Sequence, residues 1–163
     1  MSTSDQSATP LVLSVDAMGG DEGPSPIVAG LARFIAKNSG VQVLLHGPGA
    51  QLKPLIEKRK ISNSVTIVDA PDVVSMSDKP SHVMRHGKST SMWSAIESVR
   101  AKDASVCVSC GNTGALMAVS MIRLRKAEGV NRPAIACLWP SRNKAGFNVM
   151  LDAGADIRAD EED

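Results

Sequence analysis

With 163 residues the chain has the length of one ordinary domain, and 43% hydrophobic with 21% charged residues is typical of a globular protein. Only 2% of the residues are aromatic and the formal net charge is +1, which argues against a stacking nucleic-acid binder and against general attraction to nucleic acid or anionic membranes. Residues 1–10 are polar, unlike a signal peptide, and are predicted to be a flexible tail. Three cysteines form no extracellular disulfide framework, so the cytoplasm is the expected compartment.

The first half of the chain alternates apolar runs with helical patterns. In chain order, the periodicity predicts a strand over 11–17, a glycine-rich loop over 18–23, a helix opening at Pro24 or Pro26 and ending at 38–40, a strand over 41–46, a helix over 51–60 and a strand over 65–69.

The second half continues the alternation after the stretch 70–87, for which no element is predicted. The pattern predicts a helix capped by Ser89 or Thr90 and running to about Lys102, a strand over 104–110, a tight loop over 111–114, a helix to about Lys126, and strands over 133–138 and 147–152 that can form a hairpin.

Strand, loop and helix repeated four times predict a mostly parallel sheet with helices on both faces, a three-layer α/β/α fold. The strands are nearly continuous apolar runs, which suits burial on both sides. In such sheets the ligand binds outside the carboxyl ends of the strands, and both glycine loops follow strand ends. The sequence therefore places a candidate site at these loops.

The first loop combines acids with two adjacent glycines. Gly19 and Gly20 permit close backbone approach, and a following helix start favours an anion. Asp16 and Asp21 would repel an anion, so they hold a cation, accept a proton or cap the loop. A tight strand-to-helix turn with a capping Asp explains the same residues without any function.

The second loop is the better candidate for an anion. Asn112 and Thr113 supply neutral donors between Gly111 and Gly114, and the next helix adds its positive end. A helix N-cap with flanking glycines is the alternative reading of these four residues.

Lys88 and Ser89 follow a glycine as in a P-loop, but His82 stands where that motif needs its first glycine. Lys88, with Ser89, Thr90 and Ser91 at a helix start, can still grip a phosphate, or can simply be a solvated lysine beside a capped helix. No dinucleotide fingerprint occurs in the chain.

The cysteines and histidines carry weaker signals. Cys107 and Cys110 form a CxxC late in a predicted strand, where the two side chains would point to opposite faces. A redox pair, a nucleophilic Cys110, or a zinc site with His82 and His86 are therefore weaker interpretations than small buried residues.

Two long motifs give a resemblance to a known family. Residues 15–21 (VDAMGGD) and 111–117 (GNTGALM) resemble the two signatures of the PlsX family of phosphate acyltransferases, and 85–92 (RHGKSTSM) resembles its basic-then-serine segment. Residues 132–134 and 151–155 fall where the family has similar stretches. The resemblance implies that 11–163 are the N-terminal portion of a single α/β domain similar to phosphotransacetylases and isocitrate dehydrogenases.

The resemblance also implies a function. Members transfer a fatty acyl group from acyl carrier protein to inorganic phosphate, and a membrane glycerol-3-phosphate acyltransferase uses the resulting acyl phosphate in phospholipid synthesis. No cofactor and no metal are expected, nucleic acid is not a partner, and a homodimer is expected. The full-length enzyme is expected in the cytoplasm, with a peripheral contact to the membrane left open.

The motifs assign roles residue by residue. Catalytic roles are predicted for Lys88, Asn112 and Asp16. Phosphate and thioester binding are predicted for a second set: Gly19, Gly20, Asp21, Ser89, Ser91, Gly111, Thr113 and Gly114.

Two rival functions remain open at this stage. The chain can be a phosphotransacetylase-like enzyme that uses coenzyme A thioesters. It can also be an inactive fragment that binds only phosphate or a partner, since family members are considerably longer than this chain.

Overall fold

The structure, a computed structural model, describes residues 11–130 and 134–151. The chain divides after Leu124 into two compact units. The predicted tail, residues 1–10, lies outside the described residues, and the expectation of one single domain stays a prediction.

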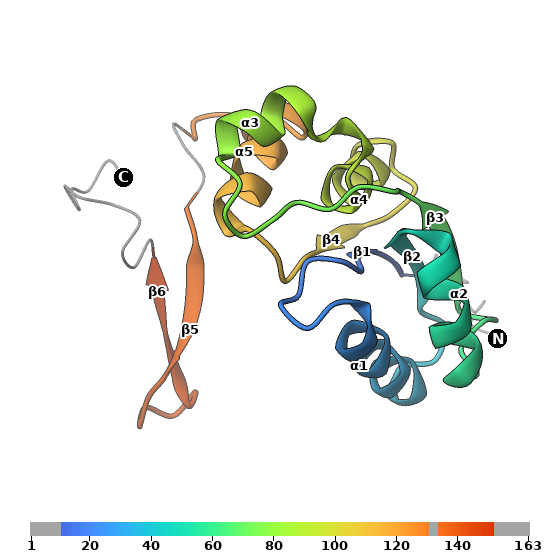
Figure 1. Ribbon diagram of the computed structural model, residues 1–163. Helices are drawn as coiled ribbons and strands as arrows, with labels where there is room; N and C mark the ends of the chain where they lie inside the picture. Colours follow the sequence, from blue (N-terminus) through green and yellow to red (C-terminus); the bar gives the residue numbers. More distant parts are fainter. Residues whose placement is uncertain (1–10, 131–133, 152–163) are drawn as a thin grey trace, which may run out of the picture. The chain divides into compact units, whose positions relative to one another are not determined.

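The first unit alternates strands and helices as the sequence predicts (Figure 1). Its elements are β1 (Val12–Asp16), α1 (Pro24–Lys37), β2 (Gln42–Gly47), α2 (Gly49–Lys58), β3 (Val65–Asp69), α3 (Pro80–His86), the 3-10 turn η1 (Gly87–Ser89), α4 (Ser91–Arg100), β4 (Val106–Val108) and α5 (Thr113–Arg123).

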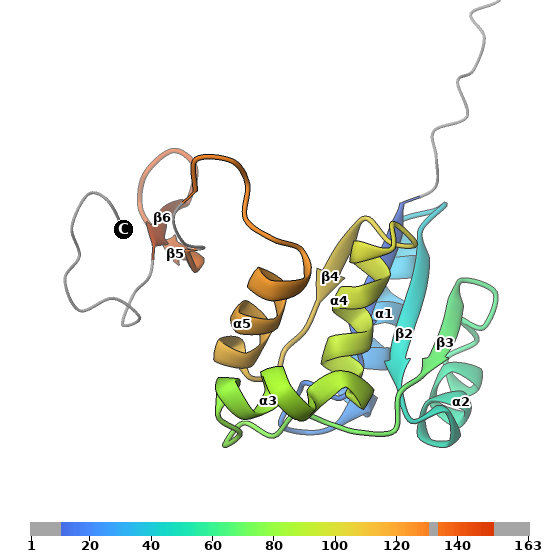
Figure 2. The ribbon, with the colours of Figure 1, turned by 90° about the horizontal axis from the view of Figure 1, so that it is seen from above.

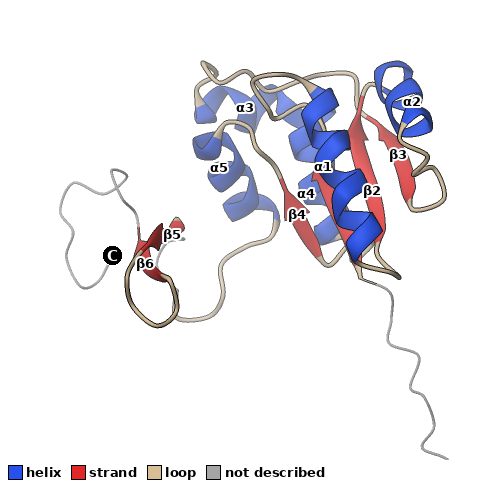
Figure 3. Cartoon of the chain, turned by 90° about the horizontal axis from the view of Figure 1, so that it is seen from below, coloured by secondary structure: helices blue, strands red, loops and turns tan. Residues whose placement is uncertain are grey.

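The four strands form one parallel sheet in the order β3-β2-β1-β4. Helices α1 and α2 contact each other on one face, while α3, α4 and α5 pack together on the other. Figure 2 shows α4 in front of the sheet and α1 behind it, and Figure 3 shows the reverse view. The predicted three-layer α/β/α fold is confirmed.

Each face of the sheet has its own apolar core. Leu31 of α1 and Leu45 of β2 belong to the core on the α1 side, and Ile96 of α4 and Val119 of α5 to the core on the other side. Large aliphatic side chains supply most of both cores, because the chain has few aromatic residues.

Local sequence signals explain several helix starts. Pro24 stands in the first turn of α1, where a missing N–H costs nothing. Thr90 caps α4, since its Oγ1 accepts a hydrogen bond from the Trp93 amide at 3.3 Å. The alternative cap, Ser89, instead donates to Asp72 at 2.5 Å.

In the first unit, the structure differs from the sequence prediction most clearly at three elements. Strand β4 is shorter than predicted at both ends. Before it, the Ala104 amide donates to the Ser98 carbonyl. After it, the Ser109 hydroxyl bonds to Asp16 and Gly111 in the loop that leads to α5. Helix α5 ends at Arg123, before Lys126. The seven-residue helix α3 lies in the stretch left without an element, since Val83 is its one buried residue and gives no apolar period.

The second unit contains a hairpin of β5 (Ala136–Pro140) and β6 (Phe147–Leu151), which confirms the predicted antiparallel pairing. Its turn is held by Asn143, whose Nδ2 donates to the Phe147 carbonyl at 2.7 Å. The predicted strand over 133–138 is shifted along the chain, because 134 and 135 precede β5 and β5 continues to Pro140; position 133 lies outside the described residues.

In the part of the chain that the structure describes, no helix is both long and apolar enough to cross a membrane.

Candidate active site

The topology singles out one place on the sheet. The chain leaves β1 for α1 on one face and leaves the adjacent β4 for α5 on the other. Ligands of open parallel sheets bind at such a switch point, outside the carboxyl ends of the two strands. Both glycine loops predicted to carry the site begin at these two strand ends.

The two loops are in direct contact at their glycines. A Cβ on Gly19 would lie 2.7 Å from the Gly111 amide nitrogen, and 2.8 Å from both Asp16 Oδ2 and Ser109 Oγ. A Cβ on Gly111 would in turn lie 3.0 Å from the Cα of Gly19. Each glycine is therefore required by the backbone of the other loop, which the sequence alone did not show.

The side chain of Asp16 links the two loops by hydrogen bonds. Its side chain is only 2% exposed. Its Oδ1 accepts from the Met18 amide at 3.1 Å, and its Oδ2 accepts from the Ser109 hydroxyl at 2.7 Å. Ser109 Oγ also accepts from the Gly111 amide at 3.2 Å. This geometry favours loop ordering, one of the roles considered for Asp16, and it brings in Ser109, which sequence reasoning missed.

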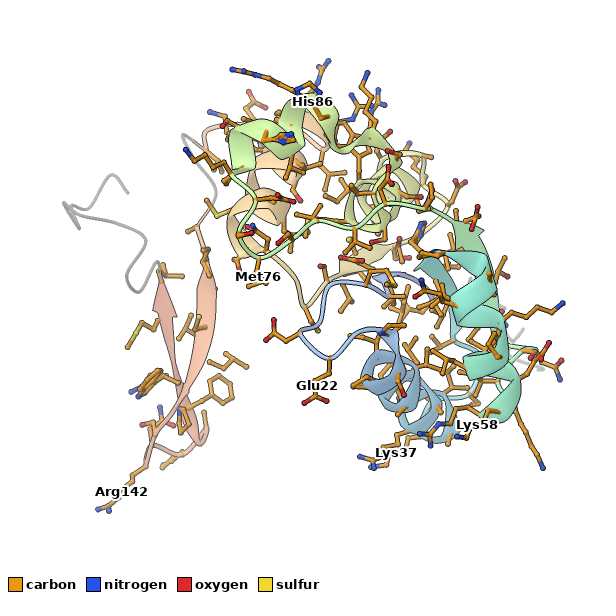
Figure 4. All side chains as sticks on the ribbon, viewed as in Figure 1. Glu22, Lys37, Lys58, Met76, His86 and Arg142 are labelled. Atoms are coloured by element: carbon orange, nitrogen blue, oxygen red, sulfur yellow. The ribbon has the colours of Figure 1, made fainter. Side chains whose placement is uncertain are left out.

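Asn112 is the N-cap of α5, because its Oδ1 accepts from the Ala115 amide at 3.0 Å. Its Nδ2 lies within hydrogen-bond distance of three carbonyls, those of Ser75 at 3.1 Å, Met76 at 3.3 Å and Asp78 at 2.9 Å. Figure 4 labels Met76 on this segment. The amide donors of Asn112 therefore fasten the 75–78 loop to the start of α5.

The start of α5 offers free donors. Thr113 and Gly114 are exposed, and no hydrogen bond from their amides occurs among the described residues. Helix N-termini of this kind attract anions. The start of α1 is less suitable, because Pro24 and Pro26 lack N–H groups.

The first loop carries two exposed acidic side chains, Asp21 and Glu22. Asp21 is exposed, and the neighbouring Glu22 points into solvent (Figure 4). Gly20 is more open than Gly19, since the nearest atom to an added Cβ is 3.7 Å away, on Ile27. The first loop is thus less favourable for binding an anion than the second.

The third set of predicted site residues, Lys88, Ser89 and Ser91, lies in η1 and at the start of α4. Lys88 is exposed and lines a cavity of about 350 Å³ that also involves Glu97 and Arg123, the last residue of α5. That end of α5 is ten residues, or roughly 15 Å, from Thr113. The described contacts therefore do not bring Lys88 to the glycine loops.

Two serines of this group behave differently. Ser89 is exposed and bonded to Asp72, whereas Ser91 is 1% exposed and its Oγ has no hydrogen-bond partner among the described residues. An unpaired buried hydroxyl costs stability. Of these two serines, only Ser91 has a hydroxyl that no hydrogen bond among the described residues accounts for.

A buried histidine network was missed by sequence reasoning. His46 of β2 is fully buried; its Nε2 lies 2.9 Å from Ser14 Oγ and its Nδ1 2.8 Å from Ser94 Oγ. Since Ser14 Oγ donates to the Ala95 carbonyl at 2.8 Å, it accepts from Nε2–H, and Ser94 donates to Nδ1. A histidine inside an apolar strand pattern was the available signal.

We expect this network to make stability depend on pH. Burial lowers the pKa of His46 to about 4, against a smaller opposing effect of Asp16. The folded protein therefore favours the neutral ring, whereas the unfolded chain binds a proton below the ordinary pKa of 6.5. The contribution of His46 to the free energy of unfolding is thus fully present above pH 6.5 and is lost as the pH falls toward 4. The loss should be on the order of 3 kcal/mol.

Urea unfolding at several pH values checks this expectation. The free energy of unfolding should fall more steeply between pH 7 and pH 4 in the unmodified chain than in a His46→Gln variant, whose side chain does not titrate. Parallel curves for the two proteins would show that His46 does not titrate on unfolding.

The cysteines do not form a reactive pair. Burial, and secondarily Asp16, raise the pKa of the Cys107 thiol to about 11, so it is protonated near neutral pH. Cys110 is exposed in the loop that follows β4, so its interpretation as a small buried residue is wrong. Within 11–130 and 134–151, no three His, Cys, Asp or Glu side chains come together in a way that could hold a metal ion.

The sequence of this chain is similar to those of known proteins. The model of a family described as "Fatty acid synthesis protein" matches residues 11–163. A protein named phosphate acyltransferase from Cereibacter sphaeroides is 68% identical over 154 residues, covering 94% of this chain and 42% of the relative. Another from Ruegeria sp. is 66% identical over 153 residues, covering 93% of this chain and 41% of the relative.

The match falls on the N-terminal part of these relatives, so the chain spans less than half of their length. Both signature loops lie inside the matched residues. The chain is therefore a member of the PlsX family of fatty acid synthesis proteins, as its two signatures indicate.

Proposed function

We propose that this chain supplies the phosphate-binding part of a phosphate acyltransferase, which transfers a fatty acyl group from a thioester to inorganic phosphate. The observation that carries the proposal is the contact of the two signature loops through Gly19 and Gly111 at the switch point of the sheet. The free amides of Thr113 and Gly114 stand beside this contact and suit a phosphate. The names of the relatives supply the reaction class.

The reaction needs the phosphate to be positioned more than it needs a base to activate it as a nucleophile. Inorganic phosphate is partly present as the dianion HPO4²⁻ near neutral pH, and one oxygen of this dianion attacks the thioester carbonyl carbon. A carbon–oxygen bond forms, the carbon–sulfur bond breaks, and the phosphate proton leaves with the thiol. The protein holds the phosphate next to the thioester and stabilises the oxyanion of the tetrahedral intermediate.

The geometry supports one distribution of the predicted roles within this proposal. The amides of Thr113 and Gly114 bind phosphate, and Asp16 orders the loops that carry them. Asn112, whose donors are engaged by the 75–78 loop, fixes the start of α5 and is a positioning residue in this proposal. Ser91 is retained as a candidate ligand, because its hydroxyl has no partner among the described residues.

The identity of the thioester is a separate part of the proposal. The family resemblance favours acyl carrier protein as the donor, with a glycerol-3-phosphate acyltransferase of the membrane consuming the acyl phosphate. A preference for coenzyme A thioesters would place the protein with phosphotransacetylases instead. Comparing the turnover of the two donors at equal acyl-chain length distinguishes them.

A chimera tests the function in a protein of full length. In it, residues 11–163 of this chain replace the matched N-terminal part of the Cereibacter sphaeroides phosphate acyltransferase. We expect acyl phosphate to form at a rate that depends on phosphate concentration. A cooperatively folded chimera without turnover would contradict the proposal.

The sequence-based assignment of Lys88 to phosphate predicts that Lys88→Ala in the chimera reduces phosphate-dependent turnover by about tenfold or more, since such a contact is charge-assisted. The position of Lys88 in a cavity with Glu97 and Arg123 predicts no such loss. The unfolding free energy should barely change, because Lys88 is exposed. Lys58→Ala changes another exposed lysine, on α2, and is the matched control. Unchanged turnover of the Lys88 variant would remove Lys88 from the site, in keeping with its separation from the glycine loops.

A further inference from the structure

A group of exposed cations lies on α3 and η1, beside the candidate active site. Residues 79–96 contain three Lys or Arg and two His but no Asp or Glu, although the whole chain is nearly neutral with a formal net charge of +1. The three cations are Lys79, Arg85 and Lys88, all of them exposed and here named the basic surface. None of them forms an ion pair within the described residues, where Glu97, the next acid in the chain, is bonded to two other arginines.

The acidic residues that precede the basic surface line a separate cavity. Asp72 and Asp78 border a cavity of about 270 Å³ together with both histidines of α3, and no residue of the basic surface lines it. The carboxylate of Asp78 accepts a hydrogen bond from the Ser75 amide at 2.8 Å rather than pairing with the adjacent Lys79. Figure 4 shows nitrogen-tipped side chains projecting outward from α3 around the labelled His86. The positive charges therefore stand without a local counter-charge.

The basic surface adjoins the proposed phosphate site. Helix α3 packs against α5, and Val83 belongs to the same apolar core as Val119 of α5. At the start of both helices, a Cβ on Gly114 would lie only 3.1 Å from Cγ of Pro80. Since Lys79 directly precedes Pro80, the basic surface begins next to one of the amides to which phosphate is assigned.

Arg85 extends the positive charge along the outer side of α3. It follows Val83, the one buried residue of the helix, by two positions, or about 200° around the helix axis. Lys79 and Arg85 are about 9 Å apart along this axis, which is comparable with the Debye length of about 8 Å at physiological ionic strength. Their fields add over a span that one phosphate group cannot bridge.

We propose that the basic surface is the docking site for an acidic protein that carries the acyl group as a thioester. The inference rests on the proposed function and names the face of this chain on which the donor binds. Charge complementarity favours this occupant, because separated exposed cations match a surface with several carboxylates better than one small anion. A protein held at α3 brings its thioester to the start of α5, where the phosphate is bound.

The acidic first loop orients such a partner. Asp21 and Glu22 are exposed there and repel a surface of negative charge. Because the first loop contacts the second through Gly19 and Gly111, this repulsion and the attraction of α3 act next to the same site. An interface that combines attraction with repulsion selects one orientation of its partner.

Kinetics of the chimera described above test the docking. The variant with Lys79→Glu and Arg85→Glu is compared with a control that carries Lys53→Glu and Lys58→Glu, two exposed lysines of α2. The donors are an acyl carrier protein of net negative charge and coenzyme A, each loaded with the same acyl chain. Lys88 stays unchanged in all variants, because it is a candidate phosphate ligand.

We expect the KM for the carrier-protein thioester to rise at least about tenfold in the Lys79/Arg85 variant, since charges at the rim of an interface act on encounter. The kcat, the KM for phosphate and the KM for the coenzyme A thioester should stay unchanged. Added salt should raise the carrier-protein KM of the unmodified chimera more than that of the variant. The α2 control should behave like the unmodified chimera.

A neutral variant guards against a folding defect. A carboxylate at Arg85, in the last turn of α3, opposes the helix dipole. If the Lys79→Glu, Arg85→Glu variant loses cooperative thermal unfolding, Lys79→Gln with Arg85→Gln takes its place. The same rise in the carrier-protein KM is expected, with a smaller size.

A binding measurement keeps the inference separate from the proposed function. Fluorescence anisotropy of the labelled carrier protein is followed on titration with the 163-residue chain, whose first unit contains the whole basic surface. We expect the affinity to fall at least about tenfold in the Lys79/Arg85 variant and to stay unchanged in the α2 control. An inactive chimera together with this binding would count against the proposed function alone.

Three results would overturn the inference. The first is a variant in which neither the KM nor the affinity for the carrier protein changes. The second is an equal rise in KM for both donors, which would show that the charges act on the active site and not on docking. The third is binding to vesicles of anionic phospholipid that requires Lys79 and Arg85, without binding to the carrier protein, which would show a membrane as the partner.

Discussion

Substitution of Gly19 by alanine should destabilise the first unit by about 1–3 kcal/mol and separate the two signature loops. The added methyl would stand 2.7 Å from the Gly111 amide nitrogen, which is backbone, and 2.8 Å from Asp16 Oδ2, whose carboxylate is buried and bonded to Met18 and Ser109. The loops must move apart, which also strains the bond between Asp16 and Ser109. Urea unfolding of the chain measures the stability, and turnover of the chimera measures the effect on the site.

Gly20→Ala is the matched control for this prediction. The same methyl at the next residue meets its nearest atom at 3.7 Å, an ordinary contact with Ile27. We expect its unfolding free energy to stay within about 0.5 kcal/mol of the unmodified chain. If Gly19→Ala and Gly20→Ala were equally stable, the close approach of the two loops would not exist in solution.

Substitution of Asn112 by aspartate should release the 75–78 loop while preserving the start of α5. Aspartate keeps the oxygen that caps the helix through the Ala115 amide. It replaces the amide donor by a second oxygen facing the carbonyls of Ser75 and Asp78. We expect a loss of about 1–3 kcal/mol in the unfolding free energy.

Hydrogen exchange gives the local readout for the Asn112→Asp variant. Exchange should accelerate at residues 75–78 and remain slow in α5. Asn63→Asp, the same chemical change on an exposed turn, should alter neither exchange nor stability. Acceleration throughout α5 with an unchanged 75–78 segment would mean that Asn112 acts only as a cap.

These two predictions describe one feature of the site. Gly19 and Asp16 fix the second loop against the first, and Asn112 fixes it against the 75–78 segment. The exposed amides at the start of α5 are therefore held from two sides before any ligand binds. Such preorganised donors stabilise developing charge without reorganising during the reaction.

The order of the elements could be predicted from the sequence because its causes are local. The apolar period of α1, the proline in its first turn, the Thr90 cap and the apolar strands each act within a few residues. The N-cap position of Asn112 belongs to the same class, since its partner is the Ala115 amide. For α3 the local signal was too weak, because one buried side chain defines no period.

Only the tertiary structure decided which of these local features meet. Gly19 lies against Gly111, His46 bonds to Ser14 and Ser94, and Asn112 reaches the carbonyl of Asp78, all across large separations in sequence. Periodicity and capping carry no information about such contacts, since these depend on the strand order β3-β2-β1-β4. The sequence by itself thus determined most of the elements, the two loops and the family, whereas the packing of the sheet brought the two loops into contact and left Lys88 in a different cavity.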